Sequence, residues 1–309
     1  MVYDVIIIGA GPAGMSAGIY CCRKRLTTLI LAKDIGGQTA KSWEVENYLG
    51  YSLISGADLA NKFKEHLDNF KCTESKIGFE IKKLTQSKEL FTVQSLDGIT
   101  YQSKTVIIAS GKKPRELGLV EEKKFWGRGI TYCATCDAPL FKDKVVAVIG
   151  GGDAALDAAY QLAKIATKVY LLIKDEKIKE NVDKVLLAKV SELEKVEILY
   201  QAIATKVFGE KFVSGLEYQN QKTKEIKNID LQGIFVEIGS IPNVDFCRGL
   251  VKLNKKDELI IDEHNMTSAA GIFAAGDVTD VIEKQTIIAA GEGAKAAIAV
   301  ANYLSRLKN

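Results

Sequence analysis

Two cysteines separated by two residues, Cys133 and Cys136, carry the most distinctive chemistry of this 309-residue chain, and Asp137 follows them directly. A C-x-x-C pair closes a small ring that can open and close without a large backbone movement, so it can exchange with the disulfide of a partner. The carboxylate of Asp137 can give or take the proton that thiolate attack and departure require. The pattern predicts a redox-active dithiol.

A zinc site and a pair of inert buried cysteines are the alternatives for this dithiol. A structural zinc site needs four ligands. The sequence contains no second C-x-x-C, and its two histidines, His66 and His264, are not at ligand spacing. We therefore expect no bound metal. The other cysteines, for which we expect helix packing or surface thiols and no catalytic role, are Cys21, Cys22, Cys72 and Cys247.

Two glycine-rich turns have the spacing of dinucleotide-binding motifs. They consist of Gly9, Gly11, Pro12 and Gly14, and of Gly150, Gly152 and Ala155. In such a turn the first glycine permits a tight bend, the second lets the backbone approach the pyrophosphate, and the third position (glycine or alanine) allows close helix–strand packing. The N-terminus of the following helix supplies free N–H groups and a partial positive charge. Both turns predict nucleotide sites.

The elements that position these turns repeat along the chain. An apolar run at 5–8 precedes the first turn, a helical stretch follows to about residue 25, and a second apolar run occupies 28–31. The second turn has the same surroundings, with apolar runs at 145–149 and 169–173. Each segment is the strand–turn–helix–strand opening of a dinucleotide-binding fold. The chain therefore contains two such domains.

The C-terminal segment indicates how the two domains are connected. Residues 271–277 form a short apolar strand that ends in Gly-Asp, and a helix should follow from about 285 to 304. In a doubly wound flavin domain such a strand lies near the first strand. We therefore predict an α/β fold of two Rossmann-like domains, the second inserted into the first. The predicted first domain is 1–112 with 246–309, and the predicted inserted domain, which carries the dithiol, is 113–245.

Two prolines lie where the chain should cross between these domains. Pro114 and Pro242 fix φ and disfavour helix in the preceding residue, which suits a defined but unpaired linker. A two-stranded connection would let the inserted domain swing as a rigid body. Ordinary turn prolines are the alternative.

The residues that should select the nicotinamide cofactor are ambiguous. The second strand ends at Ile173, where an NAD site normally offers an acidic residue and an NADP site an arginine nearby. Lys174 and Lys179 could attract a 2′-phosphate, although Asp175 and Glu176 offset their charge. A solvated charged loop is the alternative. The choice between NADPH and NADH stays open.

Composition limits the class of protein. Hydrophobic residues make up 47% of the chain, charged residues 26%, and the net charge is +3. These values are ordinary for a globular protein and indicate neither a nucleic-acid nor a membrane partner. The uncharged stretch 5–22 is interrupted by glycines and a proline, and Asp4 precedes it, unlike a signal peptide. Six unevenly spaced cysteines fit a reducing compartment, so we expect a cytoplasmic protein.

The ordered set of motifs resembles the low-molecular-weight thioredoxin reductases over essentially the whole chain. The resemblance rests on residues 128–137 ahead of 145–152, and on 36–38, 45–48, 109–111 and 271–277. It implies an FAD site. The residues that match the family's FAD-binding motifs, with Pro12 and Gly111 inside two of them, are Gly9, Gly11, Pro12, Gly14, Gly37, Gln38, Asn47, Gly111, Gly276, Asp277 and Gln285.

The resemblance also implies a route for electrons. They would pass from NADPH through FAD to Cys133 and Cys136, and then to thioredoxin. Asp137 would be the proton donor, and Arg128 would lie in the partner-docking region. The enzyme would be a homodimer whose inserted domain rotates between two states. Which cysteine faces the flavin stays open.

The chain departs from the family at the nicotinamide site. The family carries His-Arg-Arg where Ile173, Lys174 and Asp175 stand here, and a further arginine at Lys179. A lone lysine cannot reproduce the bidentate grip of an arginine on a 2′-phosphate. Residues 137–141 and 231–235 are similar to the reductase component that serves alkyl hydroperoxide reductases. That component carries an extra N-terminal thioredoxin-like region, whereas this chain begins at the flavin motif.

Four functions are therefore compatible with the sequence. The first is a thioredoxin reductase with an altered donor. The second is an NADH-dependent reductase for a peroxiredoxin system, and the third is a reductase that takes electrons from a protein such as ferredoxin. The fourth is a non-catalytic flavin redox sensor.

Overall fold

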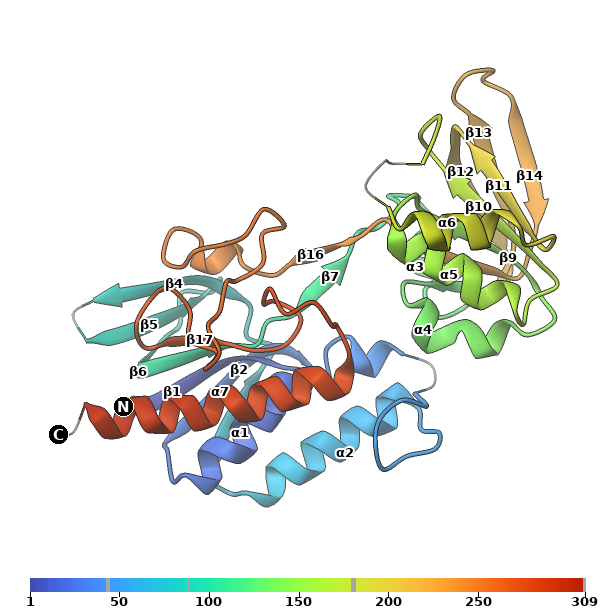
Figure 1. Ribbon diagram of the computed structural model, residues 1–309. Helices are drawn as coiled ribbons and strands as arrows, with labels where there is room; N and C mark the ends of the chain where they lie inside the picture. Colours follow the sequence, from blue (N-terminus) through green and yellow to red (C-terminus); the bar gives the residue numbers. More distant parts are fainter. Residues whose placement is uncertain (43–44, 88, 179–181, 308–309) are drawn as a thin grey trace. The chain divides into compact units, whose positions relative to one another are not determined.

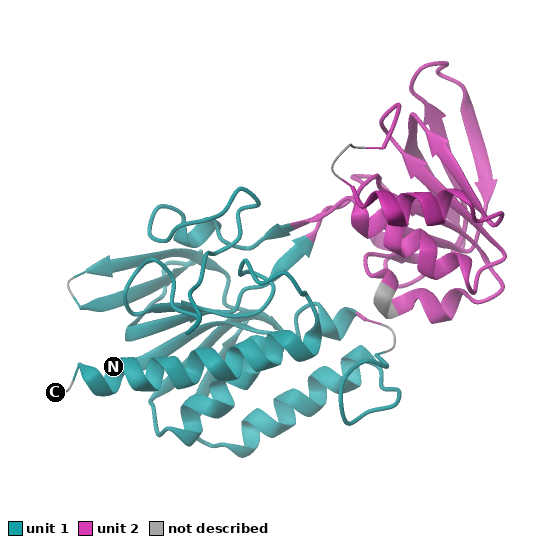
Figure 2. Ribbon diagram, viewed as in Figure 1, with its two compact units in different colours: residues 1–41, 45–113, 241–309 teal, residues 42–44, 114–240 magenta. Residues whose placement is uncertain are grey.

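A computed structural model describes residues 1–42, 45–87, 89–178 and 182–307, apart from the side chains of Thr135 and Cys136. The chain packs into two compact units (Figure 2). Unit 1 comprises Met1–Lys41, Val45–Lys113 and Ile241–Asn309, and Pro114–Ser240 makes up almost all of unit 2. Unit 2 is thus inserted into unit 1, and each unit has its own buried core.

Unit 1 is built on a mixed sheet whose parallel part has the order β3-β2-β1-β6-β17, with the antiparallel hairpin β4–β5 paired to the beginning of β6. Its strands are β1 Val2–Ala10, β2 Thr28–Ile35, β3 Thr73–Ile77, β4 Ile81–Ser87, β5 Leu90–Ser95, β6 Thr100–Ile108 and β17 Ile272–Ala274. Its helices are α1 Pro12–Arg23, α2 Gly56–Asn69 and α7 Thr286–Arg306, with short 3₁₀ turns η1 Thr39–Lys41 and η3 Asp245–Cys247. The C-terminal strand β17 therefore completes the sheet that β1 begins.

The two faces of this sheet bury alternate residues of β1. Val5 and Ile7 pack in one cluster with α1, α2 and α7, whereas Ile6 and Ile8 pack in another with β4, β5 and residues from 244 onward. Figure 1 shows the three helices along one face of the sheet. Successive strand residues point to opposite faces. The unbroken apolar run of β1 is thus explained by burial on both sides.

Unit 2 contains a second parallel sheet of order β11-β10-β9-β15-β8 and an antiparallel sheet of order β12-β13-β14. Its strands are β8 Ile130–Thr131, β9 Val145–Ile149, β10 Lys168–Ile173, β11 Val196–Tyr200, β12 Ala202–Gly209, β13 Val213–Asn220, β14 Ile226–Asp230 and β15 Gly233–Val236. Its helices are α3 Glu122–Phe125, α4 Ala134–Asp137, α5 Asp153–Ala163 and α6 Lys184–Ser191, with η2 at Ala138–Phe141. Helices α5 and α6 cover one face of the parallel sheet, and β12–β14 cover the other. The predicted fold class, two Rossmann-like α/β domains with the second inserted into the first, is confirmed.

The two crossing segments pair with each other, contrary to the expectation of unpaired linkers. Strand β7 (Lys112–Pro114) and strand β16 (Ser240–Pro242) form a two-stranded sheet (Figure 1). The amide of Arg115 donates to the carbonyl of Gly239, and the amide of Asn243 donates to the carbonyl of Gly111. Because proline has no N–H, these bonds come from the residue after each proline.

The uncharged N-terminal stretch folds as strand β1, the glycine turn and most of helix α1. Among the residues that the structure describes, no helix is long and apolar enough to cross a membrane.

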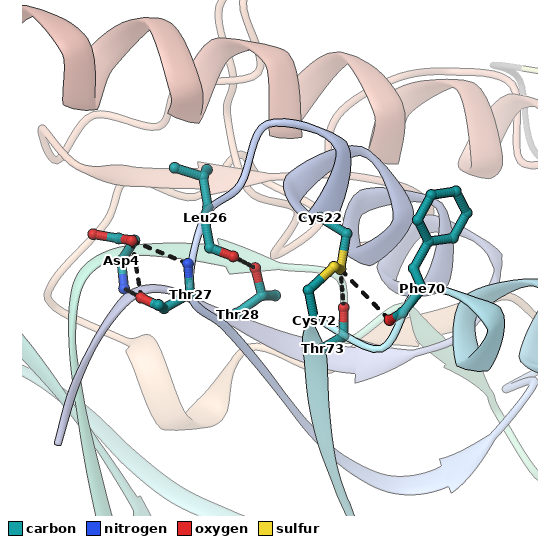
Figure 3. Close-up of a disulfide and its surroundings, with 8 residues drawn as sticks. All are labelled: Asp4, Cys22, Leu26, Thr27, Thr28, Phe70, Cys72 and Thr73. Carbon is teal, nitrogen blue, oxygen red and sulfur yellow. Dashed lines mark hydrogen bonds between the residues drawn. A yellow bond between two sulfur atoms is a disulfide. The ribbon is translucent and has the colours of Figure 1, made fainter.

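One expectation about the cysteines is wrong. Cys22 and Cys72, expected to be packing or surface thiols, form a disulfide with their Cα atoms 5.6 Å apart (Figure 3). They lie 50 residues apart in sequence, and they meet because β3 pairs with β2 beside the end of α1. Cys21 and Cys247 are buried free thiols, and burial raises the pKa of each to about 12.

Candidate functional site

The predicted dithiol lies at the start of helix α4, directly after strand β8. The sulfur of Cys133 is in a disulfide, and the side chain of Cys136 lies outside the described part of the structure. The amide of Asp137 donates to the carbonyl of Cys133 at 3.1 Å, which closes one helical turn around the C-x-x-C segment. The backbone thus places both cysteine positions on one short turn.

Asp137 is held by a hydroxyl from the strand that precedes the dithiol. Its side chain is buried, and Thr131 Oγ1 donates a hydrogen bond to Asp137 Oδ2. The same Thr131 oxygen accepts a hydrogen bond from the Cys133 amide at 3.3 Å. One threonine therefore connects the predicted proton-handling carboxylate to the backbone of the first cysteine.

A buried glutamate, which the sequence did not reveal, holds the other side of the same segment. Glu122 is 1% exposed and accepts hydrogen bonds from the amides of residues 117–119 and from the Tyr132 hydroxyl at 2.7 Å. Burial and this hydrogen bond raise the pKa of Tyr132 far above its usual value. The Trp126 ring packs on Tyr132 with centroids 4.7 Å apart. Glu122 lies in a Glu-Glu-Lys-Lys run that is typical of a solvated surface, so no sequence signal marked it.

A second glutamate that the sequence did not reveal contacts the dithiol helix itself. Glu237 follows strand β15, and its Oε1 accepts a hydrogen bond from the Ala134 amide at 3.2 Å. Burial raises the pKa of Glu237 to about 7, although the Ala134 amide opposes the shift. The Glu237 amide in turn donates to the Ile149 carbonyl at 2.8 Å, at the end of β9. Glu237 therefore connects the dithiol helix to the strand that leads into the second glycine turn.

The second glycine turn has the packing that a nucleotide-binding turn needs. Gly150 has φ +154°, and a Cβ there would lie 2.3 Å from the Glu237 carbonyl oxygen and 2.9 Å from the Ala155 methyl group. Gly152 caps α5, and a Cβ there would meet nothing within 4 Å. Gly150 and Ala155 thus allow the close packing, and Gly152 leaves space above the helix N-terminus.

The end of β10 offers an apolar side chain where ribose recognition would occur. Ile173 is 1% exposed, and its Cγ2 would lie 3.2 Å from a Cβ at Gly151. Lys174 is exposed, and its carbonyl accepts a hydrogen bond from Gln221. Lys179, the other predicted phosphate ligand, lies outside the described residues. Ile173 itself can provide neither a carboxylate for a 2′-hydroxyl nor a cation for a 2′-phosphate.

The first glycine turn, in unit 1, has the same construction. A Cβ at Gly9, where φ is +111°, would lie 2.3 Å from the Ala109 carbonyl oxygen, and a Cβ at Gly14 would lie 1.9 Å from the Gly9 carbonyl oxygen. Gly11 caps α1 with open space around it, and Pro12 is the first residue of the helix. Tight packing below the turn and free space above Gly11 form a cradle at the helix N-terminus.

The other predicted FAD ligands gather in the same unit. A Cβ added at Gly37 would lie 3.5 Å from the Gly11 Cα, and a Cβ added at Gly276 would lie 3.0 Å from the Ala13 Cβ. The Asn47 amide donates to Gln285 Oε1 at 3.1 Å, and the Gln38 amide donates to the Lys112 carbonyl, beside Gly111, at 2.9 Å. The structure therefore joins segments that are far apart in the sequence, and all the predicted FAD residues belong to unit 1.

A group of charged side chains next to this cradle was not predicted. Lys112 forms an ion pair with the buried Glu258, and Lys284 Nζ lies 3.7 Å from the same carboxylate. Burial raises the pKa of Asp277, whereas the charges of Lys284 and Lys112 oppose the shift. Burial and the charge of Lys112 lower the pKa of Lys284. Glu258 and Lys284 come from loops without a recognisable motif, so only the fold brings them to Asp277.

Metal ligands do not gather in the described part of the chain. No group of three or more His, Cys, Asp or Glu side chains is arranged to hold a metal ion there.

Comparisons with known proteins show which families this chain is similar to. The sequence profile of the pyridine nucleotide-disulphide oxidoreductases matches residues 3–293. The chain is 40% identical over 308 residues to a subunit of the alkyl hydroperoxide reductase of Pseudomonas aeruginosa, covering 98% of this chain and 58% of that protein. It is 37% identical to a Bacillus subtilis protein named NADH dehydrogenase, over 98% of this chain and 59% of that protein. The chain thus spans less than two thirds of the length of these relatives.

The fold is also similar to a solved structure over its whole length. The thioredoxin reductase of Streptococcus pyogenes superposes with a TM-score of 0.89 and 34% identity, covering 99% of both chains.

Proposed function

The chain belongs to the pyridine nucleotide-disulphide oxidoreductase family, and we propose that it is an FAD-dependent reductase of protein disulfides whose electrons leave through Cys133 and Cys136. The observation that carries the proposal is the Cys133 disulfide, held on a turn that side chains of Thr131, Glu122 and Glu237 anchor. An anchored turn keeps the backbone of the C-x-x-C segment in place while the disulfide of Cys133 opens and closes.

The cradle in unit 1 fits a dinucleotide such as FAD. Gly11 leaves the helix N-terminus of α1 open, where N–H groups can bind a pyrophosphate. Gly37, Gly276 and Asp277 would border the same site, and Gln38, Asn47 and Gln285 would complete it. When bound, FAD supplies two-electron chemistry that links a hydride donor to a disulfide.

Asp137 and Thr131 would manage the proton at the dithiol. Reduction of the disulfide adds two electrons and two protons and leaves two thiols. The buried Asp137 can hold one of these protons, and the Thr131 hydroxyl stabilises its carboxylate once the proton has left. We assign Asp137 as the acid and base of the dithiol.

We further propose NADH as the preferred electron donor. The buried Ile173 offers no cation to a 2′-phosphate, and Lys174 is exposed. The acceptor in this proposal is a thioredoxin-like protein disulfide. A second candidate is the disulfide relay of a peroxide-reducing system, and the 40% identity to part of an alkyl hydroperoxide reductase favours it.

One experiment tests donor and reaction together. The purified flavoprotein is titrated with NADH and NADPH in the absence of oxygen, and turnover is then measured with a thioredoxin and with a peroxiredoxin relay domain as acceptors. We expect NADH to bleach the flavin at lower concentration, and Cys136→Ser to abolish turnover with either acceptor. Cys247→Ser, a buried thiol in unit 1, serves as the matched control.

Two results would overturn the proposal. Full turnover of Cys136→Ser would exclude the dithiol as the exit for electrons. A flavin that neither nicotinamide bleaches would exclude them as donors and favour a protein donor such as ferredoxin.

A further inference from the structure

The Cys22–Cys72 disulfide lies in unit 1 and is separate from the dithiol of unit 2. Figure 3 shows it between the C-terminal end of α1 and the residue before β3. Cys22 is in the last turn of α1, and Cys72 lies between the end of α2 and the start of β3. The disulfide therefore ties the end of the helix that carries the first glycine turn to the neighbouring strand.

The two sulfur-bearing residues differ in their access to solvent. Cys22 is 5% exposed, whereas Cys72 is exposed. Thiol–disulfide exchange requires a thiolate to reach one of the two sulfurs. Cys72 is therefore the more accessible of the two residues, and attack of an external thiolate there would make Cys22 the leaving group.

The leaving sulfur has a hydrogen-bond partner in both redox states. Cys22 Sγ lies 2.7 Å from Thr73 Oγ1 and 3.8 Å from the Phe70 carbonyl oxygen (Figure 3). A disulfide sulfur carries no hydrogen, so Thr73 is the donor in the oxidised state, and the same hydroxyl would stabilise a thiolate that forms on Cys22. Once protonated, the Cys22 thiol can instead donate to the Phe70 carbonyl. The pocket is thus suited to both the disulfide and the thiol.

Positive charge flanks the disulfide in the sequence. Arg23 and Lys24 follow Cys22, Lys71 precedes Cys72, and all three are exposed. Cations near a disulfide favour the approach of a thiolate. Helix α1 also ends here, with amides of Arg25 and Leu26 donating to the carbonyls of Cys22 and Cys21, so Cys22 is held within a closed helix terminus.

We propose that Cys22 and Cys72 form a second thiol–disulfide couple of this protein, which an external dithiol opens by attack on Cys72. In the first step the dithiol's thiolate bonds to Cys72 Sγ, the Cys22–Cys72 bond breaks, and Cys22 leaves as a thiolate that takes a proton from water. In the second step the free thiol of the dithiol attacks the dithiol sulfur that is bonded to Cys72. This closes the disulfide of the dithiol and releases Cys72 as a thiol. The protein gains two electrons and two protons, and the dithiol becomes a disulfide.

The test uses the whole flavoprotein and dithiothreitol as the dithiol. Protein oxidised with diamide is incubated with increasing concentrations of dithiothreitol, and free thiols are then alkylated with iodoacetamide. Trypsin, which cleaves after Lys71 and Lys76, releases Cys72 in the short peptide 72–76. We expect Cys22 and Cys72 to resist alkylation before reduction and to become alkylated together. Because a hydrogen bond to a charged group contributes about 1.5–3 kcal/mol, Thr73→Val should slow the reduction about tenfold or more. Thr73→Ser, which keeps the hydroxyl, should reduce at the wild-type rate.

Single-cysteine variants test the direction of attack. The Cys22→Ser variant keeps Cys72, and the Cys72→Ser variant keeps Cys22. Because Cys72 is exposed and Cys22 is buried, the first variant should react with Ellman's reagent at least about tenfold faster than the second. Free alkylation of Cys72 in the oxidised protein, equal reactivity of the two cysteines, or a Thr73→Val variant that reduces as fast as Thr73→Ser would each overturn the proposal. None of these measurements depends on nicotinamide turnover, so they are independent of the proposed reductase activity.

Discussion

At the scale of single residues, several side chains hold the segment around Cys133, and in the proposed reaction one of them, Asp137, would also handle a proton. Thr131 contacts both Asp137 and the Cys133 amide, whereas Glu122 accepts a hydrogen bond from Tyr132. Glu237 contacts the Ala134 amide. Asp137 and Glu237 contact this segment directly, and their roles can be separated by experiment.

Replacing Asp137 by asparagine should lower disulfide turnover while the flavin is still reduced normally. Asparagine keeps the shape and can still accept from Thr131, but it cannot take up a proton. General acid–base catalysis contributes about 10²–10⁴-fold, so we expect turnover to fall by about 100-fold or more. Stopped-flow reduction of the flavin and steady-state disulfide reduction distinguish the two steps. A variant with unchanged turnover would exclude Asp137 as the proton donor.

Glu237 should make stability depend on pH near neutrality. Burial raises its pKa from 4.5 to about 7, so between these values the folded protein retains a proton that the unfolded chain releases. Its contribution to stability is therefore present below about pH 4.5 and lost as pH rises through 7, an effect on the order of 3 kcal/mol. Glu237→Gln should show a smaller loss of unfolding free energy between pH 4.5 and 8. Identical pH dependences for the two proteins would contradict this assignment.

At the scale of elements, the first glycine turn depends on how closely α7 packs on α1. A Cβ at Gly293 of α7 would lie 2.0 Å from the Ala13 carbonyl oxygen, whereas a Cβ at Gly291 would meet nothing within 4 Å. Gly293→Ala should separate the helices, cost about 1–3 kcal/mol and weaken FAD retention. Gly291→Ala, the matched control on the same helix, should stabilise by up to about 1 kcal/mol. Denaturant unfolding and flavin release measure both effects.

The Cys22–Cys72 bond joins two elements of that same unit. The two cysteines are 50 residues apart in sequence. Closing a loop of this length lowers the entropy of the unfolded chain, which predicts a stabilisation of the folded protein of about 4 kcal/mol. Cys72→Ser should therefore lower the unfolding free energy by about 2–4 kcal/mol under oxidising conditions. Wild type and variant should become similar in dithiothreitol, and a difference that persists after reduction would show that side-chain packing is the cause.

At the scale of the whole molecule, the two units have separate cores. The two buried clusters of unit 2 consist of residues between 114 and 240, which form one continuous segment. Unit 1 by contrast needs both ends of the chain, because β17 and α7 pack with β6 and α1.

The fragment 114–240 should therefore fold without the rest of the chain. We expect a cooperative unfolding transition, no bound flavin, and a Cys133–Cys136 disulfide that dithiothreitol still reduces. Circular dichroism with denaturant and thiol counting provide the measurements. A fragment without a cooperative transition would show that unit 2 depends on unit 1 for its stability.

The sequence alone determined the two glycine turns, the C-x-x-C pair and the insertion of one Rossmann-like domain into another. The turns and the cysteine pair are local features, since each involves neighbours along the chain. For the same reason the sequence indicated the apolar residue Ile173 at the end of β10. The insertion is not local, and it was predicted from the order of the motifs, because a strand ending in Gly-Asp near the C-terminus belongs beside the first strand.

Only the tertiary structure decided which distant side chains complete the sites. Glu237 reaches Ala134 because β15 lies beside β9 and β8, and Glu258 reaches Lys112 and Lys284 through loops that carry no motif. Cys22 and Cys72 meet because parallel pairing of β2 and β3 places the start of β3 near the end of α1. Such contacts depend on how elements far apart in the sequence pack together, and neither residue type nor spacing records that packing.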